Sequence, residues 1–542
     1  MRITLEHWIK SSPTKRWDAL LSFVAALFCL VCIVLVTTFS WGRDQGIYAL
    51  IGDGILNGKA PYLDLWDFKP PGVLFVYAAA QALFGRSIEA IRVLEALGLI
   101  AMVLGLVTLS KRLQGNALAG WLAGAIAVYA HVMLDFWHTG QPESFGGVLT
   151  ILALCAVTTS ADKTTRPSAA FVAGLLLGLT SLMKPTLGGA LIVVAAYLFR
   201  QHPEPSKVWR RSLPLLAMVT GAGAVFCAVG LYFVRYKAWS ALWWTLHDFA
   251  PGYTALGWHP DSSPLGMLHY ALIESLTKFS VFIPIGLVAA LVLPSAHNRE
   301  HEGVYLICGI AIFQIIGIAI QAKFFEYHYG ATIPLLAFLA GLGWAKLWWS
   351  AQARGVVSAL AFALTLLLAA LIAPAVHDLP GSPWQRTLQR LRFLRHVREP
   401  SAREQLDGKV ARAASFDLSA DREVAEWMKG QTGPDDSVLV WGFEPAIYWF
   451  AERRPATRFI YDVAQRSPWQ QARARQWFME DIGKSKPVVV AVQHSDIFPG
   501  VTGHNTDSAA DIADFPEFEK WLEARYYPAG YRYNFEYYRR RD

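Results

Sequence analysis

Apolar runs of about 18 to 22 residues recur along the first 375 residues of this chain, and they constrain its fold more than any other feature. A run of this length can cross a bilayer as an α-helix, whereas the helices of soluble proteins pair an apolar face with a charged one. The composition agrees, because 54% of the 542 residues are hydrophobic and only 17% are charged. The sequence therefore predicts an α-helical polytopic membrane protein.

About eleven spans are expected, together with one helix at the membrane interface. The first run, 19–39, has no small-residue cleavage site after it, so we expect it to remain as an anchor. The run 72–84 covers only about half a bilayer and is expected to be interfacial. The other predicted spans are 88–110, 117–135, 142–160, 169–183, 186–200, 213–234, 279–294, 303–321, 331–349 and 356–374.

Basic residues set the expected orientation of these spans. Those that precede the first span place the N-terminus in the cytoplasm, namely Arg2, Lys10, Lys15 and Arg16. Later ones fall at joints on the same side, namely Lys111, Arg112, Lys163, Arg166, Arg200, Lys207, Arg210, Arg211, Arg299 and Arg354. An odd number of spans then puts the C-terminal part outside, on the side of the loop 41–72.

Two classes of function receive no support from the composition. The net charge of +7 comes mostly from short loops that set topology, without a basic stripe interleaved with aromatic residues, so we predict no nucleic-acid partner. All five cysteines lie inside apolar runs, so neither a disulfide framework nor a cysteine metal site is predicted.

The loop 41–72 is rich in charged residues, among them Arg43, Asp44, Asp53, Asp64, Asp67 and Lys69. Charged side chains beside the hydrocarbon core are energetically unfavourable unless water or an opposite charge stabilises them, or unless they serve in binding or catalysis. We therefore interpret this loop as the floor of an active site. The other outside loops should converge on it, namely 136–141, the Lys184-Pro185 break, 235–278 and 322–330. Their many Trp and Tyr residues fit either an interfacial belt or stacking against sugars and prenyl chains.

Asp44 is the first acid after the anchoring span. A carboxylate at this depth can act as a general base or hold a divalent cation. The structural alternative is an N-cap of a helix over 45–57. Asp64 and Asp67 are expected on a turn that faces water.

The remaining candidates each have a functional and a structural interpretation. Lys69 is held extended by two prolines and suits a phosphate. Glu143 opens a predicted span, where helix capping is the alternative, and Lys184 interrupts an apolar hairpin, where snorkelling is the alternative. His328, close to Lys323, suits metal, sugar or phosphate, although a hydrogen-bonded histidine at a helix end is the commoner case.

Past the last span, the residues 384–397 predict a basic amphipathic helix that lies on lipid headgroups, within a linker over 376–417. Residues 418–542 predict a small extramembrane α/β domain with buried strands at 437–442 and 487–492. No glycine-rich phosphate loop follows either strand, so no chemistry is assigned to this domain.

Several of these features together resemble the GT-C glycosyltransferase superfamily, in the branch of the protein O-mannosyltransferases and lipid A aminoarabinose transferases (glycosyltransferase families 39 and 83). The resemblance covers roughly residues 20–350. It rests on Asp44 after the first span, Tyr48, Gly58-x-x-Pro61-Tyr62-x-Asp64, Asp67-x-Lys69-Pro70-Pro71-Gly72, Arg92, Glu143, Lys184 and Tyr327-His328-Tyr329 before Pro334.

The resemblance implies transfer of a sugar from a polyprenyl-phosphate donor, with inversion, to a lipid A, glycan or protein acceptor. It implies Asp44 as the catalytic carboxylate, Lys69 as the donor-phosphate ligand and Glu143 as the second acid. The further candidates for substrate binding are Arg43, Tyr48, Tyr62, Lys184, Lys323 and His328. The expected location is the inner (cytoplasmic) membrane, with the active site and the C-terminal domain on the periplasmic side.

Metal dependence is a separate question. Family members often carry an acidic residue next to the catalytic Asp, whereas Asp44 lies between Arg43 and Gln45. A divalent metal ion is the one cofactor considered, with Asp44 and Glu143 as its candidate ligands.

Two alternatives belong to other functional classes. Polytopic folds with broken helices also occur in secondary transporters and flippases. Against that interpretation, the charged residues of this chain concentrate in loops, and its two halves show no internal repeat. A scaffold protein without catalytic activity is the third interpretation.

The expected topology can be measured directly. Reporter domains fused after residue 60 and after residue 540 should both behave as exported, because both positions lie on the non-cytoplasmic side. A cytoplasmic signal from the second fusion alone would mean that one span has been miscounted.

Overall fold

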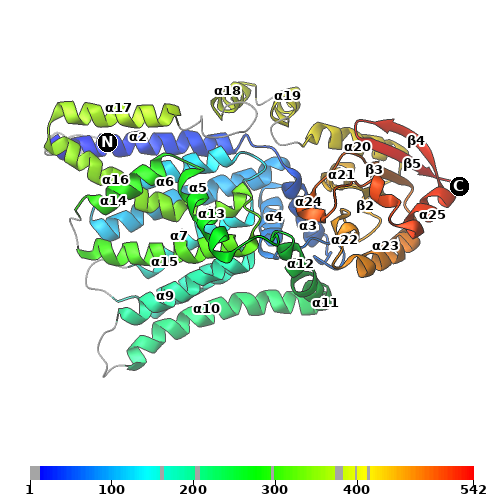
Figure 1. Ribbon diagram of the computed structural model, residues 1–542, viewed down its shortest axis with the longest axis horizontal. Helices are drawn as coiled ribbons and strands as arrows, with labels where there is room; N and C mark the ends of the chain where they lie inside the picture. Colours follow the sequence, from blue (N-terminus) through cyan, green and yellow to red (C-terminus); the bar gives the residue numbers. More distant parts are fainter. Residues whose placement is uncertain are drawn as a thin grey trace.

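The computed structural model describes residues 13–158, 164–201, 208–294, 298–372, 383–396, 399–411 and 416–541. A bundle of apolar helices forms one part of the molecule and a small α/β domain forms the other, at one end of the long axis (Figure 1). A few features discussed above lie outside the described residues, namely Arg2, Lys10, Lys163, Lys207, the last residue of the 384–397 helix and the boundary at 375/376.

The predicted apolar runs are helical. The bundle comprises α2 (Pro13–Val36), α5 (Ile88–Gln114), α6 (Leu118–Leu134), α7 (Pro142–Val157), α8 (Pro167–Met183), α9 (Gly189–Arg200), α10 (Val208–Arg235), α13 (Pro264–Thr277), α14 (Phe282–Val292), α15 (Asn298–Gln321), α16 (Ile333–Ala353) and α17 (Val356–Ile372). Shorter elements at the end near the α/β domain are α3 (Arg43–Leu56), α4 (Gly72–Phe84), η1 (Pro185–Gly188), α11 (Trp239–Trp243), η3 (Trp244–Phe249), α12 (Ala250–Ala255) and η4 (Glu326–Tyr329).

Five of the described helices are long and apolar enough to cross a membrane, namely Lys15–Val36, Ile88–Gln114, Ser212–Arg235, Gly303–Gln321 and Ile333–Ala353. The pair α13 and α14 would add a sixth as one span bent by 96°. Shorter apolar helices occupy the other predicted spans, so the polytopic class is confirmed while the count of eleven remains a prediction. Residues 72–84, expected as a short helix, form α4.

The helices of the bundle expose apolar side chains on their outer surface. Phe23 and Leu27 of α2 and Leu216 and Leu231 of α10 are examples. Such a surface is unfavourable in water and favourable against lipid. The bundle therefore has the outward-facing apolar character of a multi-pass membrane protein.

Small residues bring neighbouring helices close together. A Cβ built on Gly174 of α8 would lie 2.0 Å from the carbonyl oxygen of Met218 in α10. One built on Gly343 of α16 would lie 1.8 Å from the carbonyl oxygen of Gly286 in α14. Any side chain at either position would force the helices apart, which is the packing rule of apolar helices in membranes.

The C-terminal domain contains a five-stranded sheet in the order β2-β1-β3-β5-β4. Its strands are β1 (Ser437–Trp441), β2 (Arg454–Pro455), β3 (Val489–Gln493), β4 (Tyr526–Arg532) and β5 (Phe535–Arg540), with β1 parallel to β2 and β3, and β5 antiparallel to β3 and β4. Its helices are α20 (Leu418–Gln431), α21 (Ala446–Ala451), α22 (Val463–Arg466), α23 (Gln471–Ser485), α24 (Pro499–Thr502), η6 (Ala510–Ile512) and α25 (Pro516–Arg525).

The two buried strands predicted for this domain, β1 and β3, are confirmed. Strand β2 has two residues, which is too short to give a sequence pattern. The hairpin of β4 and β5 was also missed, because β4 is almost entirely exposed and lacks a buried apolar face.

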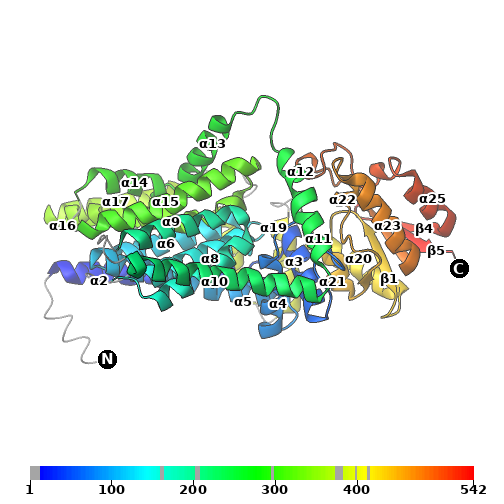
Figure 2. The same cartoon turned by 90° about the horizontal axis from the view of Figure 1, so that it is seen from below.

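The C-terminal domain packs directly on the first loop. The backbone N–H of Trp66 donates to the carbonyl of Arg458 at 2.7 Å, and the Trp66 ring packs edge-on to Phe249 and beside Phe459. Both views place the domain, with its helix α21, beside α3 at one end of the bundle (Figures 1 and 2). The loop 41–72 and the domain therefore share one side, as the expected topology requires.

The amphipathic helix after the last span differs from the prediction. It forms α18 (Pro383–Leu394), followed by α19 (Pro400–Ala411), but its arginines do not all face headgroups. Arg386 and Arg390 are 4% and 3% exposed and form ion pairs with the buried Asp135. The expectation is wrong for these two residues, because a buried carboxylate in the 135–141 loop binds them more strongly than headgroups would.

Candidate active site

Asp44 lies in the first turn of α3, directly after the turn that follows α2. The cap position belongs to Gly42, whose N–H donates to Oε1 of Gln45 at 2.8 Å, so the N-cap interpretation of Asp44 is wrong. A Cβ on Gly42 would lie 2.7 Å from Cβ of Trp137, which explains why glycine stands at this close approach. The carboxylate of Asp44 is therefore free to make contacts outside its own helix.

The Asp44 carboxylate forms the centre of the site. Its Oδ2 lies 2.7 Å from Nζ of Lys69 and accepts a hydrogen bond from Nε2 of Gln141 at 3.0 Å. Burial acts to raise the pKa of Asp44, but the ammonium of Lys69 and the amide of Gln141 outweigh it, and the pKa lies below its ordinary value. Asp44 is thus an ionised carboxylate whose counter-ion is the predicted phosphate ligand.

Lys69 is held from several sides. The hydroxyl of Tyr62 donates to the carbonyl of Lys69 at 2.7 Å, which fixes the backbone before the two prolines. Its ammonium lies 5.0 Å from the ring centroid of Tyr48 and 5.8 Å from that of Tyr327. Tyr62 is buried, so the structure gives it a positioning contact rather than an open binding surface.

Gln141 joins Tyr48 to Asp44. The hydroxyl of Tyr48 donates to Oε1 of Gln141 at 3.0 Å, while the amide nitrogen of Gln141 donates to Asp44. The side chain of Gln141 is therefore fixed in one orientation between donor and acceptor. Sequence reasoning missed it, although it directly precedes the proline that opens α7 and lies in a loop predicted to reach the site.

Glu143 and Lys184 form a second ion pair nearby. Glu143 lies in the first turn of α7 and is buried, and Lys184 ends α8 where Pro185 interrupts the helices. Burial lowers the pKa of Lys184 although Glu143 opposes that effect, and the charge of Lys69 lowers it further. Lys69 and Lys184 are thus close enough to repel each other, and a bound anion would reduce that repulsion.

A divalent cation does not fit this arrangement. Each of the two candidate acids, Asp44 and Glu143, is already neutralised by a lysine. No group of three His, Cys, Asp or Glu side chains in the described part of the chain is arranged to hold a metal ion. The two acids therefore act here as partners of lysines and not as metal ligands.

His328 lies at the edge of the same cluster, in η4 beside Tyr327. Burial lowers its pKa well below the ordinary value, and the charges of Lys184 and Lys69 add to that effect, so the imidazole is neutral. Its Nδ1 is buried without a hydrogen-bond partner among the described residues. A neutral imidazole with an unused nitrogen can accept or donate one hydrogen bond to a substrate.

Two predicted substrate-binding residues turn toward the C-terminal domain instead. Nζ of Lys323 donates to the carbonyl of Gly500 at 2.8 Å and lies over the ring of Tyr253. Burial lowers the pKa of Lys323 to about 8. Arg43, although adjacent to Asp44, extends to Glu444 of that domain. The structure therefore places both at the margin of the Asp44 cluster.

Asp67 was expected to face water and does not. Its side chain is fully buried, and its Oδ1 accepts a hydrogen bond from the hydroxyl of Tyr461 at 2.6 Å. Burial raises the pKa of Asp67, while Lys69 and Tyr461 oppose the rise. No sequence signal could have linked the two residues, because 394 positions separate them.

Arg92, part of the family resemblance, holds the loops together. Its guanidinium pairs with Glu95 at 2.7 Å and donates to the carbonyls of Ser40 and Phe136 at 2.5 and 2.8 Å. It therefore ties α5 to the turn after α2 and to the loop that carries Gln141. We assign it a structural role.

Replacing Tyr461 by Phe tests whether the C-terminal domain shapes the site. The change removes the hydrogen bond from Tyr461 to the buried Asp67 side chain and should cost about 1–3 kcal/mol of unfolding free energy. Thermal unfolding of the purified protein measures it. The control is Tyr527→Phe, an exposed residue of the same domain. Equal unfolding midpoints for the two variants would contradict the assignment.

Comparisons with known proteins found a matching family model and similar solved structures. A family model described as dolichyl-phosphate-mannose-protein mannosyltransferase matches residues 68–232. A comparison of the sequence with curated proteins gave no match.

Two solved structures cover nearly the whole chain. ArnT from Cupriavidus metallidurans, in a crystal structure bound to undecaprenyl phosphate, is similar with a TM-score of 0.56 and 15% identity, over 97% of this chain and 98% of that chain. The apo crystal structure of the same protein gives a TM-score of 0.57 with the same identity and coverage. The chain thus has the fold of these ArnT structures, with a bundle of apolar helices and a small C-terminal α/β domain, and the expected resemblance is confirmed.

Proposed function

We propose that this chain transfers a sugar from a polyprenyl-phosphate donor to an acceptor on the non-cytoplasmic face of the inner membrane. The observation that carries the proposal is the Asp44–Lys69 pair, 2.7 Å apart, at the end of a bundle of apolar helices. The ArnT structure bound to undecaprenyl phosphate supports a donor of this kind. The acceptor is a hydroxyl or amine of a lipid such as lipid A, a glycan or a protein.

Lys69 and Lys184 are the groups that bind the donor phosphate. The leaving group, a polyprenyl phosphate, gains negative charge as the bond between the anomeric carbon and the phosphate oxygen breaks. Ammonium groups already in place stabilise that charge without reorganisation. Glu143 keeps Lys184 in position through its ion pair, which gives this acid a positioning role.

Asp44 is the general base in this mechanism. In the free enzyme Lys69 holds its pKa low, so its carboxylate is a weak base. When the donor phosphate attracts Lys69, Asp44 loses its counter-ion, and burial then raises its basicity. The acceptor attacks the anomeric carbon, its proton passes to Asp44, and the polyprenyl phosphate departs, so one direct displacement inverts the configuration.

Different parts of the structure suit the prenyl chain and the sugar of the donor. The apolar helices offer a surface for the prenyl chain. For the sugar, Tyr48 and Tyr327 present aromatic rings near Lys69, and Tyr253 presents one near Lys323. His328 supplies a neutral nitrogen for a sugar hydroxyl. Transport receives less support, because the charged cluster lies in loops at one end of the bundle rather than along a path through it.

The first prediction from this mechanism concerns Asp44→Asn. The change keeps the size and the contact with Gln141 but removes charge and basicity, so transfer should fall about 10²–10⁴-fold. In-vitro transfer from a polyprenyl-phosphate sugar measures the rate. The control is Asp53→Asn, a partly exposed acid on the same helix. A folded Asp44→Asn protein that keeps more than about a tenth of the rate would rule out this base.

The second prediction concerns Lys69→Ala. Loss of a charge-assisted contact of about 1.5–3 kcal/mol should lower donor-limited turnover by roughly ten- to a hundredfold. Rates measured against the concentration of polyprenyl-phosphate sugar separate this effect from acceptor binding. Lys59→Ala, at an exposed position of the same loop, is the matched control. Unchanged donor kinetics would remove Lys69 from the site.

A further inference from the structure

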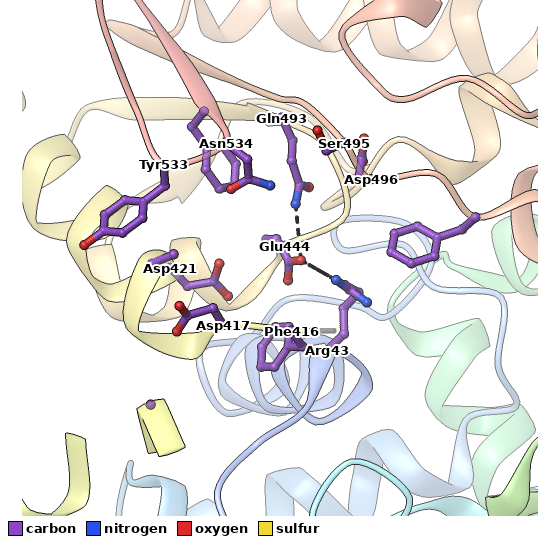
Figure 3. Close-up of a pocket in the computed structure, with 14 residues that line it drawn as sticks. Arg43, Phe416, Asp417, Asp421, Glu444, Gln493, Ser495, Asp496, Tyr533 and Asn534 are labelled. Carbon is purple, nitrogen blue, oxygen red and sulfur yellow. Dashed lines mark hydrogen bonds and ion pairs between the residues drawn. The ribbon is translucent and has the colours of Figure 1, made fainter. Parts of the chain in front are cut away.

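A cavity of about 560 Å³ lies between the start of α3 and the C-terminal domain. The residues that line it come from both parts of the chain, including Arg43, Asp417, Asp421, Glu444, Gln493 and Asn534 (Figure 3). Its volume falls within the range of about 300–1,000 Å³ that is common for small-molecule sites. Neither Asp44 nor Lys69 lines it, so it is separate from the donor centre.

Two buried carboxylates face this cavity with unused oxygens. Asp421 is 2% exposed, and its Oδ2 has no hydrogen-bond partner among the described residues. Glu444 binds Arg43 through Oε1 at 2.7 Å, and its Oε2 also lacks a partner there. In Figure 3 both carboxylates project into the space between α20 and β1. A buried carboxylate without a cation is costly, so an occupant that supplies one is favoured.

The third buried acid in the wall, Asp496, is satisfied within the protein. The Ser508 hydroxyl lies 2.5 Å from an oxygen of Asp496 and 2.5 Å from an oxygen of Asp462. One hydroxyl proton cannot serve both contacts, so one of these carboxyls carries a proton. Burial and the charge of Asp462 raise the pKa of Asp496 to about 7, in agreement. The buried carboxyl oxygens of the cavity that have no partner among the described residues therefore belong to Asp421 and Glu444.

The single guanidinium in the wall does not balance these acids. Arg43 pairs with Glu444 and packs against the rings of Phe416 and Phe498, leaving Asp421 without an ion pair. Burial and the neighbouring Glu444 raise the pKa of Asp421 well above its ordinary value. Around this acidic floor lie neutral polar side chains suited to hydroxyl groups, namely Gln493, Ser495, Tyr533 and Asn534.

We propose that this cavity binds a polyhydroxylated small molecule that carries a primary ammonium group, which contacts Asp421 and Glu444. The ammonium supplies the missing cation and donates to the two unused oxygens. An organic cation fits better than a metal ion, because no three metal-ligating side chains of the described residues are suitably grouped. The inference stands on the cavity alone and does not depend on the proposed glycosyl transfer.

The test uses the full-length protein in detergent and a pair of sugars that differ in charge. Binding of glucosamine and of N-acetylglucosamine is measured by isothermal titration calorimetry at one pH and ionic strength. The amide has no ammonium, so glucosamine should bind about ten- to a hundredfold more tightly, as expected for one charge-assisted contact. Equal dissociation constants, or no saturable binding of glucosamine, would overturn the proposal.

Asp421→Asn identifies the site of binding. The variant should fold, because it removes a buried charge that has no ion-pair partner. It should lose the preference for glucosamine over N-acetylglucosamine. The matched control is Glu426→Gln, an exposed acid on the same helix, which should keep that preference. A preference that survives in Asp421→Asn places the amine elsewhere and contradicts the proposal, and the wild-type comparison holds whichever variant folds.

Discussion

The ion pair between Asp44 and Lys69 organises the end of the bundle where the loops meet. It joins the first turn of α3 to the segment before α4, and Gln141 and Tyr62 hold the two partners from either side. The pair is partly buried, so each charge depends on the other to remain there at low cost. An anion that binds Lys69 therefore raises the basicity of Asp44 directly. The ion pair in this way links binding of an anion to proton transfer at Asp44.

The C-terminal domain completes this end of the molecule through two contacts of the first loop. Tyr461 satisfies the buried Asp67, and Glu444 binds Arg43. Arg43 and Asp44 are consecutive in the first turn of α3, yet their side chains reach different neighbours: one lines the acidic cavity and the other meets Lys69. A domain to which its sequence assigned no chemistry thus forms one wall of each site.

The errors of sequence reasoning have a common origin. Asp67 looked like a turn residue in water, and Arg386 and Arg390 looked like headgroup ligands, because local charge patterns ordinarily indicate exposure. Each was instead buried by a partner far away in the chain, Tyr461 for Asp67 and Asp135 for the two arginines. The hairpin of β4 and β5 escaped prediction for the opposite reason, since β4 is almost entirely exposed and only Phe535 and Tyr537 of β5 are buried.

By itself, the sequence determined the helical membrane class, the apolar segments, the buried strands β1 and β3, and the charged first loop, because these depend on local hydrophobicity and spacing. It also singled out Asp44, Lys69, Glu143 and Lys184. Only the tertiary structure decided that these form two ion pairs, that Gln141 binds Asp44 while Tyr461 binds the buried Asp67, and that Arg43 faces a separate cavity. Pairing energies depend on distance and burial, and neither is set until distant segments pack together.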